Sequence, residues 1–206
     1  MTKSTDAVTA WLEDCREVFA NHAAELNDID RAIGDGDHGS NMERGFVAAC
    51  QLDFESSLGI PEALRRVGMA MVSSVGGASG PLFGTLFLRI GQYWETPLTP
   101  QSFARSVRAG AEGVQARGKA SPGDATMVDA LHAAAAALEQ ATARGLDLPE
   151  ALQEGAVAAR SGAESTRQMV ARRGRAAHFA EKSLGHIDPG AVSVALISES
   201  AAKFLV

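Results

Sequence analysis

The sequence predicts an all-α protein, an antiparallel up-and-down helical bundle or barrel of about eight helices with its site at one rim. Three observations support this fold class. The 206 residues include 38 alanines, which favour helix and whose small side chains let helices pack closely. Aromatic residues make up only 5% of the chain, and no segment sustains the period-two alternation that predicts strands. Apolar residues recur instead at intervals of three and four.

This spacing predicts the first four helices. Apolar positions from Val8 to Leu26 form one stripe, and the polar segment 27–41 is expected to end that helix. Pro61 is a good first-turn residue for the third helix, and the glycines of 76–80 separate it from the fourth. The expected ranges are 6–26, about 41–54, from 61 through at least 72, and from 79 or 80 through 90 to a stop near residues 96–97.

Capping residues predict the helix boundaries in the second half of the chain. Thr99 before Pro100 predicts the start of a fifth helix that runs to about residue 117. Asp124 is expected to cap a sixth helix, which Gly145 ends. The remaining expected helices are a seventh over about 149–172, a short piece near 176–183, and a last one from the Asp-Pro-Gly of 188–190 to the C-terminus.

Composition and charge narrow the function classes. The net charge is −6 and the pI is near 5.4, so we expect neither nucleic acid nor an anionic membrane as a partner. The N-terminus lacks the apolar core of a signal peptide, and no run approaches the ~20 apolar residues of a membrane span. Cys15 and Cys50 have no disulfide or metal-ligand spacing. These features predict a cytoplasmic protein with one domain over residues 1–206.

Four connections between the expected helices combine glycine with Asp, Ser or His: 28–41, 76–80, 118–124 and 185–190. In an up-and-down bundle of eight helices, alternate connections share one end. These four precede the second, fourth, sixth and eighth helices, so they are expected to gather at the same rim. That rim is the candidate site.

The acidic segment from Asp28 to Asn41 is the densest cluster of polar chemistry. Four carboxylates within ten residues repel one another unless a hard cation gathers them, and such oxygen ligands suit Mg²⁺ or Ca²⁺. An EF-hand loop starting at Asp35 is excluded, because Ser40 and Phe46 would stand where Gly and Glu are required. A loop whose carboxylates only cap helices is the alternative that remains open.

Two nucleotide-binding fingerprints match in form only. Gly34, Gly36 and Gly39 have the dinucleotide spacing, but no strand precedes them, and the two carboxylates between them would oppose a pyrophosphate. The segment 113–120 resembles a P-loop, but Ala120 replaces the magnesium-binding hydroxyl and the segment ends a helix. Both interpretations are therefore set aside.

Two further features are compatible with anion binding at this rim. The glycine-rich turn 76–80 precedes a helix, where exposed N–H groups can hold a phosphate; a tight helix-to-helix corner is its other interpretation. Arg172, Arg173 and Arg175 precede the last rim connection. They are either a solvated surface cluster or include an arginine that faces a phosphate.

The rim motifs occur in the order GDGDHG (34–39), SVGGASGPLFGT (74–85), GKA (118–120), GDATM (123–127), RGRA (173–176) and GHIDPGA (185–191). Each motif is weak alone, but their joint occurrence at these spacings is specific. Along essentially the whole chain they resemble the nucleotide-binding L subunit of dihydroxyacetone kinase.

This resemblance implies an antiparallel helical barrel that binds ADP or ATP and two Mg²⁺ ions at one rim. It implies that the metal ligands are Asp30, Asp35 and Asp37. Arg175 is the implied catalytic residue, a cationic stabiliser in a reaction that rests on positioning and electrostatics. The implied nucleotide contacts are His38, Gly39, Ser40, Asn41, Ala78, Ser79, Gly118, Met127, Arg175, Asp188, Pro189 and Gly190.

In length the chain is similar to the stand-alone subunit of the phosphotransferase-system type. ATP-dependent members of the family are longer, because they fuse this domain to a substrate-binding domain. The resemblance then implies a phosphotransferase in which a phosphohistidine carrier subunit phosphorylates bound ADP. The phosphoryl group passes to dihydroxyacetone on a separate K subunit. The alternatives that stay open are exchanging ATP, another small ketose or polyol as acceptor, and a nucleotide-sensing regulatory protein. A homodimer also stays open.

One position departs from the resemblance. Ala125 stands where the family often has Lys, in the motif that reads Gly-Asp-Ala-Thr-Met here. We therefore expect one positive charge fewer near the nucleotide or a partner surface.

Overall fold

Eight α-helices and two short 3-10 segments make up the computed structural model, which describes residues 3–52 and 59–205. The fold class predicted above is confirmed: within the described residues every regular element is helical. The α-helices are α1 (Lys3–Ile33), α2 (His38–Cys50), α3 (Ile60–Ser74), α4 (Ser79–Gln92), α5 (Pro100–Gly118), α6 (Met127–Ala143), α7 (Leu148–Ser165) and α8 (Pro189–Phe204). The 3-10 segments, η1 (Thr166–Gln168) and η2 (Arg175–Ser183), lie between α7 and α8.

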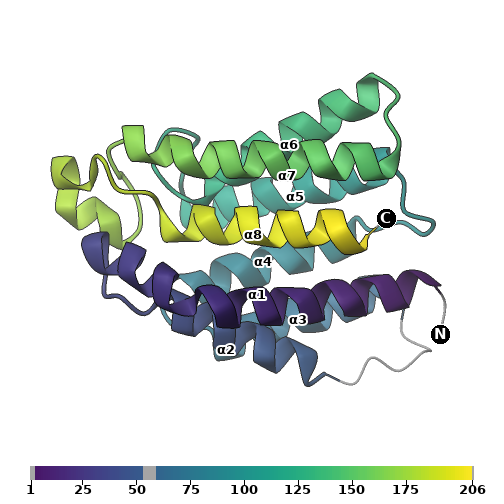
Figure 1. The fold of residues 1–206 in the computed structure, drawn as a ribbon, viewed down its shortest axis with the longest axis horizontal. Helices are drawn as coiled ribbons and strands as arrows, with labels where there is room; N and C mark the ends of the chain where they lie inside the picture. The colour runs from purple at the N-terminus through teal and green to yellow at the C-terminus, as the bar shows by residue number, and fades with distance from the viewer. Residues whose placement is uncertain (1–2, 53–58, 206) are drawn as a thin grey trace.

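The helices form a closed ring. Each helix packs against the next in the chain, and α8 packs against both α7 and α1. Both chain ends lie at one end of this barrel, and the 3-10 segments lie at the opposite end with the last turn of α1 (Figure 1). None of the described helices is both long and apolar enough to cross a membrane.

The core fills the inside of the ring. Aromatic side chains from α1, α2 and α4 are fully buried, and the rings of Phe19 and Phe46 stack with centroids 4.8 Å apart. On the other side of the barrel α6 and α7 pack through small residues. A Cβ added to Gly162 would lie 2.9 Å from the Ala130 Cα, so these two helices approach more closely than larger side chains would allow.

The first helix extends beyond its predicted end. Polar residues were expected to stop it at Leu26, but α1 continues to Ile33 because Ile29 and Ile33 prolong its apolar stripe. Asp30 therefore projects from a helix rather than a loop.

The second helix begins at His38 and not at residue 41, and it ends at Cys50, before the expected end at residue 54, which lies outside the described residues. The fourth helix ends at Gln92, before the stop expected near residues 96–97.

The other boundary errors arise where residues form hydrogen bonds outside the expected helix, either within a turn or with a distant segment. The predicted cap Asp124 instead accepts the Ser121 N–H within its own turn, and Thr126 caps α6. The predicted helix to residue 172 ends at Ser165. Beyond it the backbone N–H of Arg172 donates to the Asp124 carbonyl, so a tertiary contact replaces a helical one.

Candidate functional site

A cavity of about 710 Å³ opens at the end of the barrel opposite the chain termini. The four glycine-containing connections contribute to its wall, so the predicted rim is where the cavity lies. Its wall includes the following predicted residues: Asp30, Asp35, Asp37, His38, Asn41, Ala78, Ser79, Gly118, Met127, Arg175, Asp188, Pro189 and Gly190. The structure does not bring Gly39 and Ser40 into this lining.

Asp30 organises the acidic loop between α1 and α2. Its side chain is 8% exposed, and its Oδ2 accepts the backbone N–H groups of Gly36, Asp37 and His38 at 2.8, 3.0 and 3.3 Å. The loop turns tightly around this carboxylate, since a Cβ at Gly34 would lie 2.1 Å from Asp30 Oδ1. Three hydrogen bonds to Oδ2 fix the carboxylate and leave Oδ1 as the atom available to another ligand.

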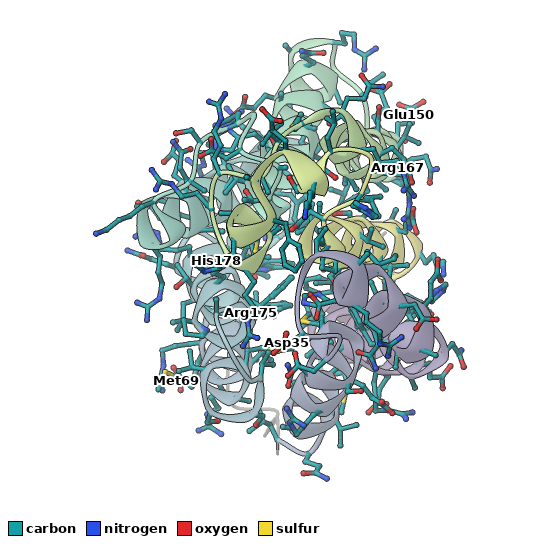
Figure 2. All side chains as sticks on the ribbon, turned by 90° about the vertical axis from the view of Figure 1, so that its left-hand side faces the viewer. Asp35, Met69, Glu150, Arg167, Arg175 and His178 are labelled. Atoms are coloured by element: carbon teal, nitrogen blue, oxygen red, sulfur yellow. The ribbon has the colours of Figure 1, made fainter. Side chains whose placement is uncertain are left out.

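Asp35 and Asp37 are exposed and have different surroundings. Asp35 forms an ion pair with Arg175, and the two side chains point toward each other across the cavity mouth (Figure 2). Asp37 stands at the N-cap position of α2, yet its side chain makes no capping hydrogen bond. The interpretation of this loop as a set of helix caps therefore fails for Asp37.

The three aspartates form a cluster that fits a divalent cation. Asp30, Asp35 and Asp37 each offer a carboxylate oxygen, and these oxygens lie within 4.8 Å of one another. Among the described residues this is the one group of three or more acidic, His or Cys side chains with such geometry. An all-oxygen donor set of this kind suits Mg²⁺ or Ca²⁺ better than a transition metal.

His38 links three helices beneath the acidic loop. Its Nε2 lies 2.8 Å from the Ser193 hydroxyl on α8, and its Nδ1 lies 3.3 Å from the Ser79 hydroxyl on α4. The Ser193 hydroxyl donates to the Pro189 carbonyl, so it accepts from His38 Nε2–H, and Nδ1 accepts from Ser79. Burial lowers the pKa of His38 to about 4, which keeps the imidazole neutral at physiological pH.

This neutral histidine makes stability depend on pH. Because the pKa of His38 is lower in the folded chain than in the unfolded chain, its contribution is present above about pH 6.5 and is lost as pH falls toward 4. Between pH 6.5 and 4.5, without divalent cations, wild type should lose about 2 kcal/mol more unfolding free energy than His38→Gln. Urea unfolding at both pH values measures this. Equal losses would show that His38 titrates normally.

Asp188 caps the N-terminus of α8 and is partly buried in the cavity wall. Its Oδ2 accepts the Ala191 N–H at 2.7 Å, and its own N–H donates to Thr166 Oγ1 at 2.9 Å. Burial raises the pKa of Asp188 to about 7, an effect that the Ala191 hydrogen bond opposes. A carboxyl group with this pKa can donate or accept a hydrogen bond near neutral pH.

The glycine-rich turn before α4 lies against the acidic side of the cavity. A Cβ at Gly76 would lie 2.8 Å from Asn41 Oδ1, so this glycine allows close contact with α2. Gly77 has φ +63°, a conformation that side chains disfavour, and its Cα faces the Arg175 guanidinium. The turn delivers Ser79 to the first turn of α4, whose free N–H groups favour anions.

Gly39 and Ser40 serve the packing of α2 on α1. A Cβ at Gly39 would lie 2.0 Å from the Ala23 carbonyl oxygen, so only glycine permits this approach. Ser40 is exposed, its N–H donates to Asn27 Oδ1, and its hydroxyl accepts from Asn27 Nδ2 at 2.8 Å. Their roles as nucleotide contacts stay predictions, and the side chain of Ser40 already has a partner.

Apolar side chains form part of the cavity wall. Leu82 lies against Gly118, with 3.4 Å between Leu82 Cδ2 and the position of a Gly118 Cβ, and Met127 lies equally close to Gly190. Ala125 is not part of this wall. It is buried with Ile33, Ala171 and Ala176. The position at which the family often has a positive charge therefore lies outside the cavity lining in this chain.

Sequence reasoning missed several members of the wall. Arg117 and Thr126 line the cavity, and each could have been found because it adjoins a predicted contact in the chain. Arg173 was noted only within a charge cluster, and it lines the cavity whereas Arg172 does not. Ser193, the partner of His38, has no sequence signal beyond its place one turn after Pro189.

The sequence of the chain is similar to those of named kinases. The chain is 43% identical over 197 residues to the PEP-dependent dihydroxyacetone kinase, ADP-binding subunit DhaL, of Escherichia coli, with 94% of each chain covered. It is 38% identical over 203 residues to an L-erythrulose kinase of Pectobacterium atrosepticum, covering 96% of this chain and 34% of that one.

A solved structure has the same fold. The dihydroxyacetone kinase from C. freundii in complex with AMP-PNP and Mg²⁺ matches with a TM-score of 0.73 and 27% identity, covering 95% of this chain and 33% of that chain. Residues 32–203 match the DAK2 domain. That match spans most of the chain and includes seven of its eight α-helices and the end of α1. The chain therefore belongs to the DAK2 domain family.

Proposed function

We propose that this chain is the ADP-binding subunit of a dihydroxyacetone kinase of the phosphotransferase-system type. A phosphohistidine carrier subunit phosphorylates bound ADP, and the phosphoryl group passes to dihydroxyacetone on a separate K subunit. The observation that carries the proposal is the cluster of Asp30, Asp35 and Asp37 in the wall of a cavity large enough for a nucleotide. The identity to the E. coli subunit over nearly the full chain supports the same assignment.

The three aspartates would hold two Mg²⁺ ions between the loop and the phosphates. Carboxylates and phosphates repel one another. Divalent ions bound between them would offset this repulsion and neutralise the negative charge that develops during phosphoryl transfer. Asp30 is preorganised for this role, because three backbone N–H groups hold its carboxylate in place before any ion binds.

The remaining wall residues position the nucleotide. The first turn of α4, with the Ser79 hydroxyl oriented by neutral His38, would face the phosphates. The apolar part of the wall formed by Leu82, Met127 and Gly118 would hold the base. Arg175 would stabilise negative charge on the phosphoryl group in transfer, since this reaction rests on electrostatics and needs no covalent nucleophile from the chain.

A different acceptor is the second candidate. The similarity to an L-erythrulose kinase favours it, because the related segment in that protein serves a kinase for another small ketose. The acceptor would lie on the K subunit in either case, so the two versions require the same nucleotide site of this chain.

Retention of ADP is the expected result that tests the phosphotransferase-system assignment. Protein purified in Mg²⁺ without added nucleotide should release close to one ADP per chain on denaturation, because ADP acts here as a resident cofactor. Chromatography of the released nucleotides measures this. If ADP is absent but ATP with Mg²⁺ raises the melting temperature, an exchanging kinase or a nucleotide-sensing regulator is favoured.

Reconstitution separates those two outcomes. Addition of the K subunit, the carrier subunit and dihydroxyacetone should produce dihydroxyacetone phosphate, and a pure regulator would produce none. No response to either nucleotide would contradict the proposed function.

A further inference from the structure

The Arg175 side chain spans the mouth of the cavity. Its Nη1 pairs with Asp35 Oδ2, and its Nη2 lies 3.8 Å from the position that a Cβ would take on Gly77. The guanidinium group thus connects η2 to the loop before α2 and to the turn before α4. In Figure 2 Arg175 and Asp35 meet in the centre of this end of the barrel.

The same carboxylate belongs to the three-aspartate cluster. Asp35 offers an oxygen within 4.8 Å of those of Asp30 and Asp37, so the arginine lies beside the place where a divalent cation would bind. The positive charge of the guanidinium opposes another cation at this distance, and the ion pair occupies Asp35 Oδ2, one of the two carboxylate oxygens through which this residue could bind a metal. Arg175 and the metal therefore compete for Asp35.

Exchange between the two partners needs only a side-chain rotation. The backbone beside Arg175 is anchored, because Ala176 is buried against Ile33 and Ala125. The Arg175 side chain itself is 56% exposed, and that of Asp35 is 36% exposed. The long arginine side chain can leave Asp35 while the backbone of η2 stays in place.

We propose that Arg175 neutralises Asp35 when the site holds no metal and is displaced from it when a divalent cation binds, which frees the guanidinium for the nucleotide phosphates. This rests on the proposed function, since it takes the three aspartates as metal ligands. Metal binding and ADP binding are then coupled through one side chain. By linkage, each ligand increases the affinity for the other by the same factor.

The proposal predicts that removal of the arginine strengthens metal binding in the absence of nucleotide. Arg175→Gln should bind Mn²⁺ about three- to fivefold more tightly than wild type, the size expected for loss of a partly exposed ion pair. With Mn²⁺ saturating, the same variant should bind ADP about tenfold more weakly, because a charge-assisted contact to phosphate is lost. Electron paramagnetic resonance of free Mn²⁺ and calorimetry with ADP measure the two effects.

Arg31→Gln is the matched control. Arg31 also flanks the acidic loop, since its Cβ and Nε lie 3.3 Å from the position of a Gly36 Cβ, but it pairs with the exposed Asp28 on its own helix. Its removal lowers the local positive charge equally without changing any partner of the three-aspartate cluster. Mn²⁺ affinity should therefore change less than about twofold.

The outcomes separate this inference from the proposed function. Tighter Mn²⁺ binding by Arg175→Gln but not by Arg31→Gln supports the exchange. Equal effects of the two substitutions, or no change for Arg175→Gln, overturn the exchange and leave the metal site standing. If wild type binds no Mn²⁺ with or without ADP, the proposed metal site and the exchange are both wrong.

Discussion

Asp37→Asn is expected to abolish divalent-cation binding while leaving the fold intact. The substitution removes one of three clustered carboxylates, so the affinity for Mn²⁺ should fall at least about 100-fold, and ADP binding that depends on the metal should fall with it. The free energy of unfolding should change by less than about 0.5 kcal/mol, because the Asp37 side chain makes no capping hydrogen bond. Calorimetry with Mn²⁺ and ADP, together with urea unfolding in EDTA, measures both quantities.

Asp28→Asn is the control for charge alone. Asp28 is exposed one turn before the cluster, pairs with Arg31, and lies outside the cavity lining. Its substitution removes the same charge and should leave Mn²⁺ affinity within about twofold of wild type. If Asp37→Asn binds Mn²⁺ as wild type does, the loop is not a metal site.

Asp30→Ala is expected to remove both metal binding and stability. Its carboxylate is a member of the cluster, and it also accepts three backbone N–H groups in a largely buried position. Loss of these acceptors should lower the free energy of unfolding by about 2–4 kcal/mol, and Mn²⁺ binding should fall at least as far as in Asp37→Asn. Urea unfolding without metal measures the loss of stability separately from the loss of metal binding.

The comparison between the two aspartates distinguishes their roles. Asp28→Ala on the exposed face of α1 should cost less than about 0.5 kcal/mol, which controls for the change in helix composition. Equal stability of Asp30→Ala and wild type in EDTA would mean that the loop does not depend on Oδ2. The contact between Asp30 and the three N–H groups would then have no structural weight.

The fold was largely predictable because its signals are local. Helix spacing, the Thr99-Pro100 start and the Asp188-Pro189 start all appear in the structure as predicted. The alternation of plain and glycine-containing connections predicted that the site lies at one end of the barrel, because antiparallel helices bring every second connection to the same end.

The errors occurred where local signals compete with contacts between distant segments. Polarity suggested that α1 stops at Leu26, yet Ile29 and Ile33 keep it helical against the core. High helix propensity suggested that α7 continues to residue 172. The chain instead leaves the helix at Thr166, whose buried hydroxyl accepts the Asp188 N–H and so joins the end of α7 to the start of α8.

The sequence by itself therefore determined the helical class, the order of the helices and the end of the barrel where the polar chemistry gathers, because periodicity and capping act over a few residues. Only the tertiary structure decided what each polar side chain does there. Asp30 accepts backbone hydrogen bonds from its loop, the Asp37 side chain makes no capping hydrogen bond, and Arg175 forms an ion pair with a residue 140 positions earlier in the chain. Such roles depend on distances across the ring, which no local pattern specifies.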